Sequence, residues 1–492
     1  MNFQSFGFLA FLAVTAAVCP AAARWSRSAG AGCLTLACLA FYVSGGGWAA
    51  LLVLAAGLGV SAAAVRYLAA PDVRARPAGG GSTAYACSRA SARRRLCLAL
   101  AAAWHIGVLA LFKYAGFFTG GALSLDWAPL GLSFFTFQQL WLLKEAYDGD
   151  FRPGPGDSLA LYAFFFPSVV SGPILRPRDF FPQLHGAGFL RPDGRDLAAG
   201  LYAIAVGTAK KVLLADNLGI LVDNGWARSG ELSACTAWLV ILGYTLQLYL
   251  DFSGYCDVAA GAARLLGLRL PVNFNSPYRS LSVGEFWKRW HITLTSFLRE
   301  CLYFPLGGSR RGTGRAYLNI LIVFLASGLW HGAGWTFVLW GGLHGLGQIA
   351  ERAWGPGREK LPKLLRWAMT FLFVNLAWVF FRAPGLSAAG EVLSAAFSGS
   401  WTGPEGWLME GLFTKEVAAL ARLFPRKWRL FTPGRLLLLY GGGLAVALWP
   451  RNAAEQMDHF RPTFLRGAAL AVLAAWSILS FTGVTTFIYS NF

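Results

Sequence analysis

Residues 316–350 read AYLNILIVFLASGLWHGAGWTFVLWGGLHGLGQIA, two apolar runs that meet at a histidine. The runs cover 316–330 and 335–350, and glycines stand between them. About 20 apolar residues cross the hydrocarbon core of a bilayer as a helix. Both runs predict membrane helices, of which 316–330 is short for a full span. His331 ends the first run, where an ionisable side chain is costly and is usually retained for a function. Packing, with the imidazole hydrogen-bonded between helices, is an equally weighted alternative.

Apolar runs of the same kind recur along the whole chain of 492 residues. The sequence is 56% hydrophobic and 14% charged, against roughly 25% charged residues in soluble domains. We therefore expect an all-α polytopic membrane protein with about 10–12 transmembrane helices. No long polar segment interrupts the runs, so residues 1–492 are predicted to form a single membrane domain. Weaker stretches at 127–147 and 255–305 predict re-entrant or interfacial helices. The other runs are 5–23, 30–43, 46–69, 97–118, 157–174, 197–222, 234–252, 365–382, 433–449 and 466–488.

The net charge of +19 comes from basic residues that cluster in short loops between the apolar runs. Examples are Arg93–Arg95, Arg310 with Arg311 and Arg315, and Arg426 to Arg429. This distribution is typical of cytoplasmic loops in contact with membrane lipids. No basic stripe interleaved with aromatic residues accompanies it, so nucleic acid is not an expected partner.

The eight cysteines contain no CxxC pair, and most lie in apolar runs. They predict small buried side chains, with neither a disulfide framework nor a metal site. A GxSxG nucleophile elbow and a glycine-rich phosphate loop are also missing from the sequence. We expect no permanently bound cofactor.

Three histidines are candidates for chemistry. His331 is preferred because flanking glycines leave space for another backbone or a substrate, and imidazole accepts protons near neutral pH. His344 lies 13 residues later, about 220° around a continuous helix, so it faces away unless the helix breaks at Gly332 or Gly334. We expect His344 to be a helix-packing residue or a support behind the site. His291, in the charged stretch 281–308, is read as assisting the reaction, holding substrate or lying at the interface.

A dense polar group follows the run 234–252. Its members either line a cavity or form hydrogen bonds where a helix unwinds; for Asn273 and Asn275 the second interpretation is slightly favoured. The group consists of Asp251, Asp257, Arg264, Asn273, Asn275 and Tyr278.

Several motifs, taken in order, resemble the membrane-bound O-acyltransferase (MBOAT) family. They are DFSGYCD at 251–257, NFNSPY at 273–278, FWKRWHITLT at 286–295 and GLWHG at 328–332. The resemblance is strongest to the bacterial branch that acetylates alginate and related exopolysaccharides, and the D-alanyl transfer protein of teichoic acids is a more distant relative. It also covers GLSFFTFQ at 131–138 and FIY at 487–489. Its core lies in 245–350, whereas 383–432 is less typical. Within the latter, 400–432 matches poorly and is a candidate contact for a particular partner.

The resemblance implies a ring of transmembrane helices around a central tunnel. In that picture His331 is catalytic, and His291 lines the same tunnel as a second catalytic residue. The basic residues from Arg310 to Arg315 place the start of the helix 316–330 at the cytoplasmic side. Fifteen residues rise roughly 23 Å, which carries His331 toward the outer side. The substrate-binding residues are expected to be Asn275, Tyr278, Trp287, Trp330 and Trp335.

The leading hypothesis is an O-acyltransferase of a bacterial inner membrane. It moves an acetyl or other short acyl group from a cytoplasmic thioester, acetyl-CoA or an acyl carrier protein, to a hydroxyl acceptor on the far side. His331 is the general base, since an alcohol is a poor nucleophile until its proton has a destination. The acceptor is a polysaccharide, or a periplasmic acyltransferase that relays the group. The alternatives are D-alanyl transfer to teichoic-acid-like polymers, a polysaccharide or lipid transporter, and a non-catalytic scaffold.

Overall fold

The computed structural model describes residues 3, 5–70, 83–123, 125, 127–423 and 431–481, without the side chains of 83–91 and 431–433. Within these residues the secondary structure is helical and contains no strand. The basic cluster at 426–429 and the motif at 487–489 lie outside the described residues. By their internal contacts, residues 1–197 with 262–271 form one compact unit, and residues 198–261 with 272–492 form a second.

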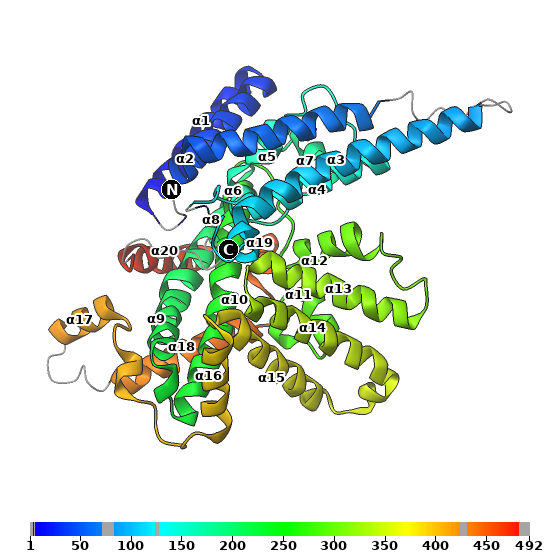
Figure 1. The fold of residues 1–492 in the computed structure, drawn as a ribbon. Helices are drawn as coiled ribbons and strands as arrows, with labels where there is room; N and C mark the ends of the chain where they lie inside the picture. The colour runs from blue at the N-terminus through cyan, green and yellow to red at the C-terminus, as the bar shows by residue number, and fades with distance from the viewer. Residues whose placement is uncertain are drawn as a thin grey trace. The chain divides into compact units, whose positions relative to one another are not determined.

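The first unit is built on two long helices, α1 and α2, which run side by side (Figure 1). Ser5 and Ser26 accept hydrogen bonds from the backbone at the starts of α1 and α2, as good N-cap residues do. Gly47, with a φ of 77°, kinks α2. The helices of this unit are α1 (Phe6–Trp25), α2 (Arg27–Leu68), α3 (Thr83–Phe118), α4 (Leu132–Asp148), α5 (Leu159–Phe164), α6 (Phe166–Val169) and α7 (Pro177–His185).

The second unit contains the core motifs. Its larger helices are α8 (Gly194–Ala209), which begins in the first unit, α9 (Asp216–Ala227), α10 (Ala234–Arg264), α13 (Thr313–His331), α14 (Trp335–Trp354), α15 (Lys363–Arg382), α16 (Leu386–Ser398), α17 (Thr414–Leu423), α18 (Phe431–Leu448) and α20 (Phe464–Leu479). Shorter pieces are η2 (Lys210–Ala215), η3 (Ser229–Glu231), η4 (Pro277–Arg279), α11 (Val283–Arg289), α12 (Ile292–Leu298), η5 (Arg299–Tyr303), η6 (Gly355–Lys360), η7 (Gly406–Met409) and α19 (Ala453–Asp458).

Seven helices in the described part of the chain are long and apolar enough to cross a membrane, and two shorter apolar helices accompany them. The predicted all-α polytopic fold is thereby confirmed. The number is below the expected ten to twelve partly because two predicted runs, 30–43 and 46–69, form the single helix α2. Another run, 157–174, breaks at Phe165 into the short helices α5 and α6.

The two apolar runs of 316–350 form the hairpin of α13 and α14 (Figure 1). The first helix ends at His331 because Gly332 adopts an extended backbone, and the second begins after Gly334, which is also extended. The helices approach closely at Gly328 and Gly341. A Cβ atom at either glycine would lie 2.3 Å from a carbonyl oxygen of the opposite helix. The space left by these glycines is therefore filled by backbone.

The stretch 255–305, for which re-entrant or interfacial helices are predicted, begins in the last residues of α10 and then breaks into short helices. After α10 the chain is irregular up to Ser282, apart from η4, and α11, α12 and η5 follow one another with sharp turns between the first two. Most of this stretch is buried although it carries several charges. The ring around a central tunnel stays a prediction.

Candidate active site

His331 is enclosed by aromatic rings at the C-terminal end of α13. Its ring centroid lies 4.7 Å from that of Trp330, 5.1 Å from Trp340 and 5.0 Å from Phe381. These rings come from α13, α14 and α15, and His331 itself is 2% exposed. The break after His331 allows α14 to fold back and supply Trp340, so the local backbone creates this enclosure.

His344 reaches the same Trp340 ring from α14, with centroids 5.1 Å apart. The estimate that His331 and His344 point to opposite sides holds only for a continuous helix, and the helix is broken. Trp287 Nε1 donates a hydrogen bond to His344 Nδ1 at 3.1 Å, which fixes Nδ1 as the acceptor. His344 is fully buried. Its contacts fit the expected packing and supporting position.

His291 begins α12 with a left-handed backbone, φ 44° and ψ 56°. Such a conformation is uncommon outside glycine and persists only where neighbouring contacts hold it. Two backbone hydrogen bonds do so: Ile292 N donates to Asn273 O at 3.0 Å, and Asn275 N donates to Arg289 O at 2.9 Å. The side-chain oxygen of Asn273 also accepts from Thr293 Oγ1 at 2.7 Å. The NFNSPY motif thus fixes the turn that carries His291.

Trp330 joins the two predicted catalytic histidines. Its ring centroid lies 6.2 Å from that of His291 and 4.7 Å from that of His331. Phe252 of α10 also packs against His291, with the two ring centroids 4.9 Å apart. His291 and His331 therefore belong to one continuous buried cluster of rings, although 40 residues of sequence separate them.

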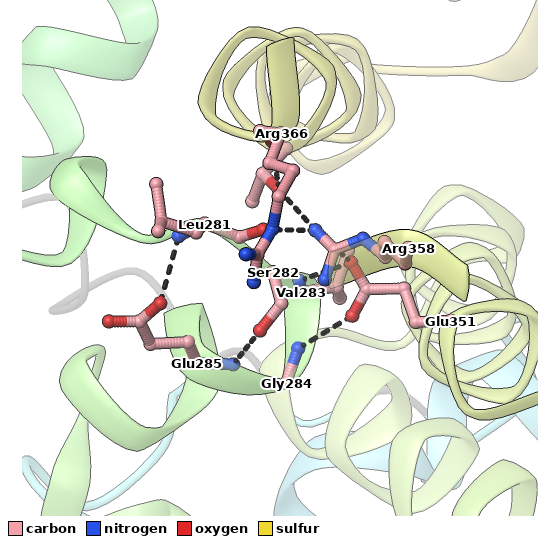
Figure 2. Close-up of polar contacts among 9 residues, drawn as sticks. Leu281, Ser282, Val283, Gly284, Glu285, Glu351, Arg358 and Arg366 are labelled. Atoms are coloured by element: carbon pink, nitrogen blue, oxygen red, sulfur yellow. Dashed lines mark hydrogen bonds and ion pairs between the residues drawn. The ribbon is translucent and has the colours of Figure 1, made fainter. Parts of the chain in front are cut away.

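The start of α11, the helix that leads to His291, is held by a carboxylate and a guanidinium (Figure 2). Glu351 accepts hydrogen bonds from Val283 N at 2.8 Å and Gly284 N at 3.1 Å, satisfying amides that a helix N-terminus leaves open. Arg358 pairs with Glu351 at 3.0 Å and donates to the carbonyl of Leu281. The end of α14 therefore fixes the start of α11.

A cavity of about 210 Å³ lies beside the ring cluster, bordered by α11, α12, η5, α13 and α14. Its inner wall includes Trp287 and the buried Ser327, which precedes His331 by four residues on α13. Four residues rise about 6 Å, so this wall is one helical turn from the imidazole. The remaining lining residues are Leu294, Thr295, Leu298, Arg299, Tyr303, Ile320, Val323, Phe324, Gln348 and Arg352.

The far side of this cavity is cationic. Arg299 and Arg352 are exposed side chains in its lining. The walls between them and Ser327 are mainly apolar, apart from Thr295, Tyr303 and Gln348. The cavity therefore combines a basic opening with an apolar interior directed along α13. Its lining contains neither His291 nor His331, so a continuous passage to them stays a prediction.

The five predicted substrate-binding residues separate into three groups. Trp287 lines the cavity and Trp330 bridges the histidines. Tyr278 is buried away from the cavity lining and donates from its hydroxyl to Thr245 O at 2.8 Å. Asn275 is exposed, and Trp335, at the start of α14, is 67% exposed. The structure does not bring Asn275 and Trp335 into the ring cluster.

Sequence reasoning missed other residues of this region. Trp340 and Phe381 supply two of the rings around His331, and Ser327, Arg299 and Arg352 line the cavity. The four-residue spacing from Ser327 to His331 was a usable signal, because it places both residues on one face of a helix. The rings had no such signal, since apolar aromatic residues occur throughout the chain.

The acidic members of the polar group form buried ion pairs instead of lining this cavity. Lys210 pairs with Asp257 at 2.6 Å. Lys211 pairs with Asp251 at 2.6 Å and with Asp216 at 2.7 Å. Both lysines lie in η2, the π-helical stretch between α8 and α9. Within the described residues, no cluster of three or more His, Cys, Asp or Glu side chains is arranged to hold a metal ion.

Residues 157–388 match the model of MBOAT, the membrane-bound O-acyltransferase family. This range includes the whole core at 245–350 and all three candidate histidines, so the resemblance seen in the motifs is confirmed by the match to this family model.

The chain is similar to several bacterial proteins. It is 40% identical over 342 residues to the peptidoglycan O-acetyltransferase of Helicobacter pylori. The matched stretch covers 62% of this chain and 65% of that protein. It is 40% identical over 316 residues to the probable alginate O-acetylase AlgI of Azotobacter vinelandii, covering 60% and 62%. The teichoic acid D-alanyltransferase of Bacillus subtilis is 27% identical over 268 residues, covering 51% and 68%. The chain thus matches somewhat less than two thirds of the length of the first two relatives.

Proposed function

We propose that this protein is a membrane O-acyltransferase that transfers an acetyl or other short acyl group from a thioester donor to a hydroxyl acceptor of a cell-envelope or exopolysaccharide polymer. The observation that carries the proposal is the cavity beside α13, whose lining includes Ser327, one helical turn before His331 on the same helix. A buried imidazole enclosed by rings, next to a cavity with a basic opening, suits proton transfer with an anionic donor. The family and the acetyltransferase relatives support the same reaction class.

The basic opening fits a phosphate-bearing thioester. Acetyl-CoA and the phosphopantetheine arm of a carrier protein both carry phosphate, and Arg299 and Arg352 offer guanidinium groups to it. The mainly apolar lining fits the hydrocarbon parts of the extended arm that carries the thioester. The basic residues Arg310, Arg311 and Arg315 at the start of α13 favour the cytoplasm for this side. His331, at the other end of α13, then lies toward the outer side of the inner membrane.

The chemical step needs one base and one leaving group. His331 accepts the proton of the acceptor hydroxyl while the oxygen of that hydroxyl attacks the thioester carbonyl. Collapse of the tetrahedral intermediate breaks the carbon–sulfur bond, and the proton passes to the departing thiolate. Trp330, Trp340 and Phe381 keep water from competing as the acceptor, because they cover His331. The acceptor is a sugar hydroxyl, or a hydroxyl of a periplasmic partner that relays the group.

The test is acyl transfer by protein purified in lipid nanodiscs, with acetyl-CoA, an acetylated carrier protein and a D-alanylated carrier protein as labelled donors. The wild-type protein is expected to release thiol from an acetyl donor and to label a polysaccharide or its relay partner. Thiol release from the D-alanyl donor alone would show that the reaction is D-alanyl transfer and not acetyl transfer. Polymer export without acyl release would indicate a transporter. Acylation that survives His331→Gln in folded protein would indicate a scaffold.

A further inference from the structure

Two further cavities, both in the second unit (residues 198–261 with 272–492), share one rim. One, of about 450 Å³, is bordered by α8, η2, α18 and α20, and the other, of about 390 Å³, lies at α19 and the start of α20. Tyr202, Arg451 and Gln456 line both, so the two form one groove. None of the histidines 291, 331 and 344 lines either cavity. The groove is therefore separate from the candidate active site.

The groove is apolar at one end and basic at the other. Leu213, Leu438 and Leu473 are among the side chains of the large cavity, whose walls are mostly aliphatic and aromatic. Arg451 and Arg466, both exposed, line the smaller cavity. This arrangement matches a molecule with hydrocarbon chains and an anionic group.

The charges inside the groove support that reading. Lys210 lines the apolar end, but it pairs with Asp257 at 2.6 Å, so no unbalanced charge is offered there. Among the described residues that line the basic end, Glu455 is the one acidic side chain, and it lies 3.9 Å from Arg451, whose side chain is 72% exposed. The guanidinium groups at the opening thus carry a net positive charge toward solvent.

Contacts within this unit place the basic opening at a definite end of the membrane helices. Ser276 Oγ donates to Trp449 O at 3.0 Å, and Arg279 donates to Pro450 O at 3.3 Å. The same loop contacts the start of α15 through a hydrogen bond from Trp367 Nε1 to Tyr278 O at 2.8 Å. Basic residues concentrate at this end, among them Arg352, Arg358 and Arg366. By the positive-inside rule the opening lies at the cytoplasmic leaflet.

We infer that the groove binds an anionic glycerophospholipid of the cytoplasmic leaflet. Its phosphate lies between Arg451 and Arg466, and its acyl chains follow α18 and α20 into the large cavity. Leu438 and Trp476 of the cavity wall are 50% and 40% exposed, so the apolar end opens sideways, where hydrocarbon surrounds a membrane helix. The lipid needs no acyl transfer, so this inference stands apart from the proposed function.

The experiment is native mass spectrometry of the full chain after exchange into nanodiscs of phosphatidylglycerol mixed with phosphatidylcholine. The wild-type protein should retain phosphatidylglycerol in preference to phosphatidylcholine. Arg451→Gln with Arg466→Gln should reduce this retention about 25-fold, since each basic residue near the surface contributes about a factor of five for an anionic lipid. Ala445→Trp, which places an indole in the apolar cavity, should reduce retention without a change of charge.

The matched control is Arg191→Gln with Arg195→Gln, which removes two exposed charges elsewhere. It should leave phosphatidylglycerol bound, and each variant is checked for an unchanged melting temperature. Equal retention of both lipids, or full retention in the folded Arg451/Arg466 variant, would overturn the inference. So would binding of glycerol 3-phosphate as tight as that of the lipid and indifferent to Ala445→Trp, because that result describes a site for free phosphate.

Discussion

The second unit (residues 198–261 with 272–492) buries polar side chains in two regions by opposite means. Around η2, every buried charge has a charged partner within 2.7 Å: Lys210 with Asp257, and Lys211 with Asp251 and Asp216. Around α13 and α14, His331 and His344 are surrounded by aromatic rings at centroid distances near 5 Å. The first region neutralises its charges with other charges, and the second surrounds imidazoles with apolar surface.

The difference separates structure from chemistry. A buried ion pair is stable while both partners remain, because each satisfies the other, and it is strongly destabilised when one is removed. An imidazole enclosed by aromatic rings can accept a proton where little water is present. This environment suits a general base that acts on a hydroxyl substrate. We therefore expect the η2 region to control folding and the α13 region to control activity.

The largest expected effect belongs to His331. His331→Ala should lower the rate of acyl transfer by about 10²–10⁴-fold, the usual contribution of a general base, and leave the protein folded. Steady-state transfer from a labelled thioester measures this, with size-exclusion profile and melting temperature as checks on folding. His185→Gln is the matched control, since that histidine is exposed and pairs with Asp157 in the other unit. Wild-type turnover by well-folded His331→Ala protein would remove His331 from the mechanism.

The next largest effect is expected on the free energy of unfolding when a buried ion pair near η2 is broken. Lys210→Met should destabilise the protein by about 3–5 kcal/mol because it leaves Asp257 buried and unpaired. Adding Asp257→Leu should restore most of that loss. The control is Lys144→Met, which breaks a partly exposed pair with Asp148 of the same 2.6 Å length and should cost about 0–1 kcal/mol. Equal losses from the buried and the exposed pair would contradict the proposed contrast.

A smaller pair of effects ranks the other two histidines. His291→Ala should lower activity in part, because its ring continues the cluster through Trp330. His344→Ala should mainly lower the melting temperature, since it removes the acceptor of the Trp287 hydrogen bond and a ring contact of Trp340. Activity and thermal unfolding are measured on the same preparations. Complete loss of activity in folded His344→Ala protein, with His291→Ala silent, would reverse this order.

The smallest effect is expected at Trp335. Its side chain is 67% exposed, unlike the buried Trp330 five residues earlier. Trp335→Ala should leave transfer close to wild type, whereas Trp330→Ala should lower it by removing the ring between His291 and His331. Parallel rate measurements on the two variants check this. A large loss with Trp335→Ala would show that the outer end of α14 takes part in binding the acceptor.

The helix that carries His331 was predictable from the sequence because the signals for it are local, whereas the roles of the predicted site residues stay predictions. The apolar run before His331 predicts a helix, and the glycines after it allow the break that the structure shows. Exposure distinguishes Trp335 and Asn275 from the other predicted site residues. Trp335 starts a new helix four residues after His331 with an exposed side chain, and Asn275 is exposed while Asn273 holds the turn.

Composition and spacing by themselves determined the membrane character, the helical class, the basic loops and the histidines worth testing, because hydropathy and helical period are properties of neighbouring residues. Only the tertiary structure decided which side chains meet. Trp340 and Phe381 close around His331 because α14 and α15 fold back on α13, and Lys210 meets Asp257 because α8 and η2 pack against α10. The physical reason is that a packed contact depends on distance in space. Lys210 and Asp257 are 47 positions apart and His331 and Phe381 are 50 apart, so no pattern of neighbouring residues predicts that they meet.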